Sequence, residues 1–125
     1  MLDLSDGDMV IDTGCNDGTL LKQYSSNLLR VGVDPSNSIL DITDKSIVCI
    51  NDYFTAPNVR EEIPEKKARV ITSISMFYDL SDPERFVNDV KDLSKYFLFK
   101  LNLLEWGGIF FNWVILKIFD FFLMI

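Results

Sequence analysis

The chain alternates between short apolar runs and segments in which apolar residues recur at helical spacing. Four runs of four to eight mostly apolar residues cover 9–13, 30–34, 47–50 and 68–75. Runs of this kind, without strict polar alternation, are typical of strands buried on both faces of a parallel sheet. The pattern therefore predicts an α/β protein in which strands and helices alternate along the chain.

Helices are predicted over four segments: after Gly18 as far as Leu28, over 36–42, between Pro57 and Pro64, and over 83–96. The last is the clearest helix, because its apolar side chains share one face: Phe86, Val90, Leu93 and Phe97. Asp82 is the expected N-cap of this helix, with Pro83 at its first position. Ser36 or Asn37 is expected to cap the short helix over 36–42.

Composition and charge narrow the class of protein. A chain of 125 residues that is 48% apolar has room for one globular core. Its net charge of -7 argues against non-specific nucleic-acid binding, which needs a basic surface. Two cysteines without metal-type spacing predict free thiols in a reducing, cytoplasmic setting and no metal site. The sequence has no histidine, so the commonest general base and metal ligand is missing.

The most informative stretch is Val10-Ile-Asp-Thr-Gly-Cys-Asn-Asp-Gly18. It predicts a strand that ends in a carboxylate, then a tight turn in which glycines let the backbone pass close to a ligand. Asp12 and Asp17 surround this turn with negative charge, which disfavours a pyrophosphate and favours a ligand with cationic groups. S-adenosylmethionine (SAM), with a sulfonium and an ammonium group, is such a ligand.

Asp34 ends the second predicted strand, twenty residues after Gly14. This spacing suits an acidic residue that hydrogen-bonds ribose hydroxyls. The alternative is that Asp34 only begins a turn before Pro35.

The pattern Asp12-x-Gly14-x-Asn16-x-Gly18 resembles the first motif of class I SAM-dependent methyltransferases, with Asn16 where the middle glycine usually stands. The string from Gly14 to Leu21 and the segment 75–83 resemble the branch that includes sugar C-methyltransferases. The resemblance implies a Rossmann-like three-layer α/β/α fold with a mainly parallel sheet, present as an incomplete core over residues 8–98, and SAM as the cofactor. Helices and a further domain ordinarily precede the first strand in that branch, so we expect the chain to be a fragment.

The resemblance also implies a set of cofactor-binding residues: Asp12, Gly14, Cys15, Asn16, Gly18, Asp34, Pro35, Asp52, Tyr53, Ser73 and Ile74. Asp52 would contact the adenine amino group, with Tyr53 or Phe54 against the ring; the alternative is a polar loop start followed by core aromatics. The loop after the fourth strand would face the acceptor, and Tyr78 and Asp79 are the candidates for the base. Met76 and Phe77 would line the same wall or pack in the core.

The residues after 97 follow the pattern less closely. The resembling family would continue with a turn and a fifth strand, for which Gly107-Gly108 followed by Ile-Phe-Phe is the candidate. The apolar tail 114–125 predicts a core helix, or a sequence altered by truncation or frameshift. A membrane span would bury Asn112, Lys117 and Asp120, and each charge costs roughly 2.5–3.5 kcal/mol at mid-bilayer, so a membrane partner is disfavoured. The predicted division is a partial methyltransferase core over 1–113 and an apolar tail over 114–125.

The functional prediction is methyl transfer from SAM to a small-molecule acceptor, with a sugar nucleotide suggested only by the resemblance. Three alternatives stay open: a SAM-binding remnant without turnover, an NAD-binding oxidoreductase domain and a membrane-anchored module. The oxidoreductase reading expects Gly-x-Gly-x-x-Gly, which the turn lacks.

Overall fold

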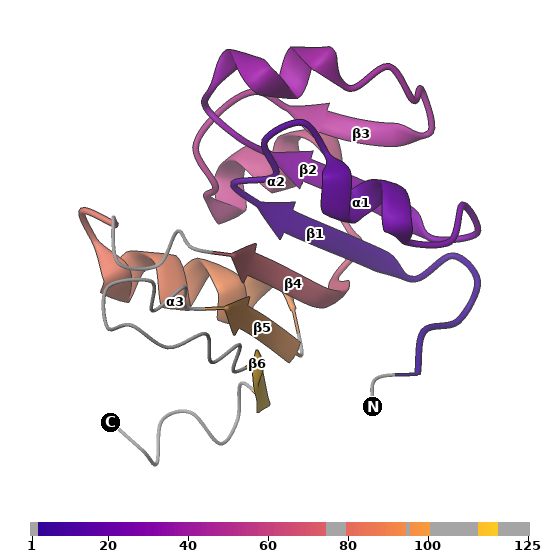
Figure 1. Ribbon diagram of the computed structural model, residues 1–125. Coiled ribbons are helices and arrows are strands. Elements are labelled where there is room, and N and C mark those ends of the chain that lie inside the picture. The colour runs from indigo at the N-terminus through magenta and orange to yellow at the C-terminus, as the bar shows by residue number, and fades with distance from the viewer. Residues whose placement is uncertain (1–2, 75–79, 95, 101–112, 118–125) are drawn as a thin grey trace, which may run out of the picture.

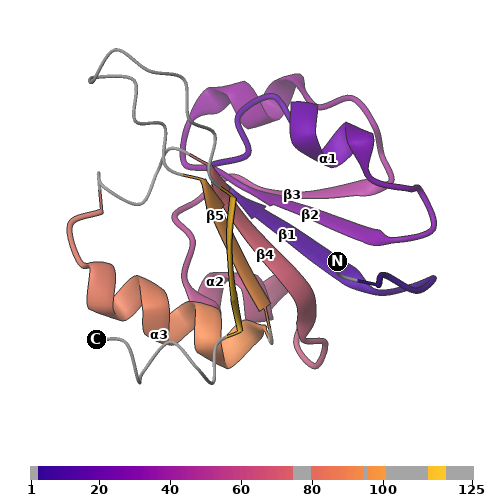
Figure 2. The same cartoon turned by 60° about the horizontal axis from the view of Figure 1, so that its bottom comes forward.

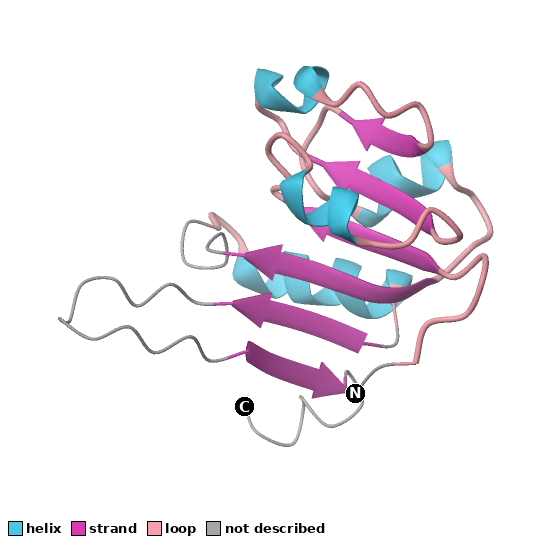
Figure 3. Cartoon of the chain, turned by 45° about the vertical axis from the view of Figure 1, so that its right-hand side comes forward, coloured by secondary structure: helices cyan, strands magenta, loops and turns pink. Residues whose placement is uncertain are grey.

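The computed structural model describes residues 3–74, 80–94, 96–100 and 113–117. Within these residues six strands form one sheet in the order β3-β2-β1-β4-β5-β6 (Figure 1). The strands are β1 (Met9–Thr13), β2 (Leu29–Val33), β3 (Ile47–Ile50), β4 (Ala68–Ile74), β5 (Tyr96–Lys100) and β6 (Trp113–Lys117). The pairs among β1 to β5 are parallel, and β6 runs antiparallel to β5, as the arrowheads in Figure 3 show.

Helices cover both faces of this sheet. They are α1 (Thr19–Gln23), the 3₁₀ helix η1 (Asn37–Asp41), α2 (Ala56–Glu62) and α3 (Pro83–Leu93). Figure 2 shows α1 on one face and α2 and α3 on the other. This confirms the predicted three-layer α/β/α architecture with a mainly parallel sheet. From β1 the chain builds the sheet outward through β2 and β3, and it then crosses to β4 on the other side of β1, so the carboxyl ends of β1 and β4 border the point where the strand order reverses.

The apolar runs form a core on each face. The larger cluster joins alternate strand residues, among them Met9, Ile11, Val31 and Ile71, to Val59 of α2 and to Phe86, Val90 and Leu93 of α3. On the other face, Leu21 of α1 and Ile39 of η1 pack with Cys15 and Ile47. Because successive side chains of a strand point to opposite faces of the sheet, the even-numbered residues of β1 face α1 and the odd-numbered residues face α2 and α3.

Two predicted helices end earlier than the periodicity suggested. The first stops at Gln23, because Tyr24 adopts an extended backbone conformation, and Leu28 lies just before β2. The helix predicted over 83–96 stops at Leu93, and Phe97, expected on its apolar face, lies in β5. Pairing with β4 satisfies the backbone of 97–100 in a sheet ladder, which outweighs local helical spacing. Asp82 is confirmed as N-cap: its carboxylate accepts the Arg85 N–H at 3.1 Å.

The fifth strand was predicted in the wrong place. The strand beside β4 is β5, directly after α3, whereas Gly107 and Gly108 lie outside the described residues. The part of the tail up to Lys117 lies in strand β6 rather than in a helix, and the boundary at 113/114 falls inside that strand. The division into core and tail stays a prediction. Among the described residues, no helix is both long and apolar enough to cross a membrane.

Gly32 in the middle of β2 sets how closely the loop after β1 and helix α1 approach the sheet. A Cβ atom at this position would lie 2.7 Å from the Cys15 Sγ atom and 2.9 Å from a Leu21 methyl group. We expect Gly32→Ala to lower the free energy of unfolding by roughly 1–3 kcal/mol through overpacking. Urea unfolding measures this, and adding Cys15→Ala should restore part of the loss. Equal stability of Gly32→Ala and the original chain would contradict the packing shown here.

Candidate functional site

The turn between β1 and α1 adopts an unusual backbone. Gly14, Asn16 and Gly18 all have left-handed conformations, with φ of 66°, 53° and 77°. Asparagine tolerates this region better than most residues other than glycine, which explains how Asn16 can stand where a third glycine is expected. The Gly14 N–H donates to the carbonyl of Val33 at 2.8 Å, so the turn is tied to the end of β2.

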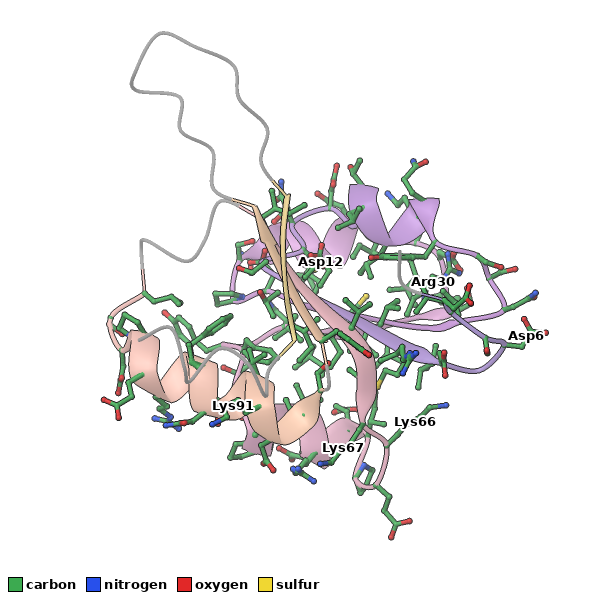
Figure 4. The ribbon with its side chains drawn as sticks, turned by 90° about the horizontal axis from the view of Figure 1, so that it is seen from below. Asp6, Asp12, Arg30, Lys66, Lys67 and Lys91 are labelled. Carbon is green, nitrogen blue, oxygen red and sulfur yellow. The ribbon has the colours of Figure 1, made fainter. Side chains whose placement is uncertain are left out.

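Asp12 is a buried carboxylate at the end of β1, only 4% exposed. The Thr72 hydroxyl donates to it at 2.6 Å. Burial raises the pKa of Asp12 from 3.8 to about 6; the Thr72 hydrogen bond lowers it, and the charge of Asp34 raises it further. Arg30, on the same α1-covered side of the sheet (Figure 4), pairs with Asp44 at 3.0 Å. Asp12 thus has no cationic partner among the described residues, although a buried carboxylate is costly without one.

Asp34 follows β2 and joins two loops through its carboxylate. Its Oδ2 accepts the backbone N–H of Asn16 at 2.8 Å, and its Oδ1 accepts that of Ser36 at 2.8 Å. Burial works against ionisation, but hydrogen bonding by the Ser36 side chain and by the backbone N–H groups of Ser36 and Asn16 prevails and holds the pKa of Asp34 below its usual value. A carboxylate offers about four acceptor positions, so these contacts leave acceptor capacity for a hydroxyl group of a ligand.

A cleft of about 580 Å³ opens between the loop after β3 and the start of α3. Its lining residues include Asp52, Tyr53, Phe54, Leu80, Arg85 and Phe86. The rings of Phe54 and Phe86 pack with their centroids 5.2 Å apart, while Tyr53 is 70% exposed. The Asp52 carboxylate accepts the Tyr53 N–H at 2.7 Å. Both residues predicted to contact adenine therefore border one cleft.

The remaining predicted site residues lie in different surroundings. The Cys15 thiol is buried against α1, and burial raises its pKa to about 12, so the thiol stays protonated at neutral pH. Pro35 is exposed in the loop after β2. Ser73 is buried and its hydroxyl has no hydrogen-bond partner among the described residues, and Ile74 is partly buried beside it. Tyr78 and Asp79 lie outside the described residues, as do Met76 and Phe77.

Two residues of the site had no predicted role. The Thr72 hydroxyl donates to Asp12, and the signal for it is a hydroxyl residue within a mostly buried strand. Asn51 donates its side-chain amide to the carbonyl oxygens of Asp34 and Ser36. No sequence signal predicts these contacts, because they depend on how the loops after β2 and β3 meet.

No family model and no curated protein matches the chain. Solved structures do match it. The chain superposes with a TM-score of 0.66 and 16% identity on a putative methyltransferase from an antibiotic biosynthesis pathway of Anabaena variabilis, covering 85% of this chain and 43% of that one. It superposes with a TM-score of 0.64 and 16% identity on the plantazolicin methyltransferase BpumL in complex with S-adenosylhomocysteine (SAH), covering 76% and 39%. The chain has a class I methyltransferase fold.

A third methyltransferase structure agrees with this assignment. A SAM-dependent methyltransferase from Aquifex aeolicus matches with a TM-score of 0.58 and 18% identity, over 79% of this chain and 58% of that one. The chain therefore spans between 39% and 58% of the length of these three proteins. At such low identities the likeness establishes the methyltransferase fold alone.

Proposed function

We propose that the chain is a SAM-binding methyltransferase core. The observation that carries the proposal is Asp12, a buried carboxylate at the carboxyl end of the central strand with no cationic partner among the described residues. A cationic ligand would supply that partner. Asp34 beside the same turn suits ribose hydroxyls, which SAM and NAD both carry, so the buried Asp12 is what disfavours the pyrophosphate of a dinucleotide. The carboxylates of this site thus fit SAM better than NAD.

Each part of the site has a role in this proposal. Asp12 holds the ammonium side of SAM, and the left-handed turn over 14–18 lets the methionine portion approach the backbone. Asp34 accepts the ribose hydroxyls, and Asp52 with Tyr53 receives adenine at the cleft. SAM supplies a methyl group already activated by its sulfonium, so the protein mainly binds, aligns and excludes water.

The acceptor and the base are proposed from the sequence. We infer a small-molecule acceptor, and the resemblance of 75–83 to sugar C-methyltransferases makes a sugar nucleotide the first one to test. An acceptor hydroxyl or carbon must lose a proton, and Tyr78 and Asp79 are the candidates that the sequence offers.

Calorimetric titration of the whole chain with SAM and with SAH tests the proposal. We expect binding at sub-millimolar concentrations of both ligands and none of NAD at the same concentrations. Absence of heat with SAM and SAH would remove the proposed function, and binding of NAD alone would restore the oxidoreductase reading. Radiolabelled SAM with a sugar nucleotide then separates an enzyme from a binding module: label stays on SAM if the chain only binds.

A further inference from the structure

The loops after β1, β2 and β3 meet at Asp34 through hydrogen bonds from different segments. Asn16, in the first loop, donates its backbone N–H to Asp34 Oδ2 at 2.8 Å. Asn51, directly after β3, donates its side-chain Nδ2 to the Asp34 carbonyl oxygen at 3.0 Å and to the Ser36 carbonyl oxygen at 2.9 Å. One amide group therefore holds both ends of the turn that contains the Asp34 carboxylate.

The turn over 34–36 needs support from outside. Pro35 has no N–H to donate, and within the turn the Ser36 N–H is satisfied by the Asp34 carboxylate itself. The Asp34 N–H donates to the carbonyl of Ile50 at 3.1 Å, which anchors the start of the turn to β3. The Asn51 amide has two N–H donors and holds the remainder of the turn by bridging its two carbonyl groups. An aspartate at this position has the same shape, but its carboxylate would repel these carbonyls.

Holding these two carbonyls fixes the direction of the Asp34 side chain. The Asp34 carboxylate must reach the Asn16 N–H and the Ser36 N–H at once, and the two carbonyls held by Asn51 flank the turn that carries this side chain and the Ser36 N–H. The acceptor capacity left on the carboxylate is thereby aimed before any ligand arrives. Preorganisation of this kind raises affinity because less freedom is lost on binding.

We propose that Asn51 is a positioning residue that aims Asp34 at a ligand with two neighbouring hydroxyl groups, such as a ribose. The proposal rests on the SAM-binding function proposed above. Asn51 acts through Asp34 and need not touch the ligand. Its loss should therefore matter only while the Asp34 carboxylate is present.

Asn51→Leu tests this role, because leucine keeps the approximate size of asparagine and removes both donors. We expect SAH to bind Asn51→Leu about threefold to tenfold more weakly than the original chain, the range expected for lost hydrogen bonds. In an Asp34→Asn background, Asn51→Leu should weaken SAH binding by less than about twofold, since coupled residues are not additive. Asn88→Leu, the same change at an exposed position of α3, is the matched control and should leave SAH affinity unchanged.

A measurement without ligand checks the physical link. Amide hydrogen exchange of Asn16 and Ser36 should speed up in Asn51→Leu and stay the same in Asn88→Leu. Unchanged SAH affinity in Asn51→Leu, or an equal loss with and without the Asp34 carboxylate, would overturn the positioning role while leaving the proposed function in place. If the original chain does not bind SAH, the proposed function itself fails and this role fails with it.

Discussion

Asp12→Asn is expected to raise the free energy of unfolding, compared with the original chain, by more at neutral pH than in acid. The same substitution is expected to weaken SAM binding. The folded protein raises the pKa of Asp12 from 3.8 to about 6, so folding favours the protonated acid. The stability that this group contributes is complete below pH 3.8 and is lost as the pH rises through about 6. Asparagine cannot ionise and avoids this loss. The gain of Asp12→Asn over the original chain should therefore increase by roughly 2 kcal/mol between pH 4 and pH 7.5.

Urea unfolding of both chains at these two pH values measures the difference, and any fixed cost of the new amide cancels in it. Asp41→Asn is the matched control, because it removes a carboxylate from an exposed position of η1 and should change stability little at either pH. A gain of Asp12→Asn that does not depend on pH would contradict the burial of an ionised Asp12.

SAM binding should respond to Asp12→Asn in the opposite direction. If Asp12 is the partner of a cationic group, asparagine removes the charge that attracts it, and affinity should fall about tenfold or more at pH 7.5. The site would then retain a carboxylate that destabilises the fold, a trade often found where function needs a buried charge. Unchanged SAM affinity in the stabilised variant would remove Asp12 from the ligand site.

Much of the fold could be predicted because local patterns and tertiary packing agree. Strands β1 and β3 have the predicted bounds, since each is an apolar run bordered by polar or turn residues. Asp82 and Pro83 fixed the start of α3 through local capping chemistry. The end of α3 could not be predicted, because Phe97 continues the helical spacing and only pairing with β4 places it in a strand.

The candidate site likewise contains residues that the sequence predicts and contacts that it could not predict. The sequence predicted Gly14, Gly18 and Asp34 as a group, because they follow strand ends at the spacing of a glycine turn and a ribose-binding acid. The hydrogen bonds to the two acidic residues Asp12 and Asp34 come from far along the chain. Thr72 is sixty positions from Asp12, and Asn51 is seventeen from Asp34. Such partners depend on which strands are neighbours, and the strand order is a property of the whole sheet.

Asp34→Ala is expected to weaken SAM binding at least about tenfold, or about 1.4 kcal/mol. It should also lower the free energy of unfolding by roughly 2 kcal/mol, because the N–H groups of Asn16 and Ser36 lose an ionised acceptor.

The contribution of Asp34 to stability depends on pH in the opposite way to that of Asp12. The pKa of Asp34 is lowered on folding, so its contribution is present above the ordinary aspartate pKa and is lost as the pH falls through the lowered value.

Asp34→Asn separates the two effects, because an amide keeps one acceptor oxygen and the size of the side chain but removes the charge. It should retain more stability than Asp34→Ala and still bind SAM more weakly than the original chain. Asp41→Ala is the control for removal of an exposed carboxylate and should alter neither quantity appreciably. If Asp34→Asn folds and binds SAM with unchanged affinity, then Asp34 only ties the loops after β1 and β2 together, and the ribose must be held elsewhere.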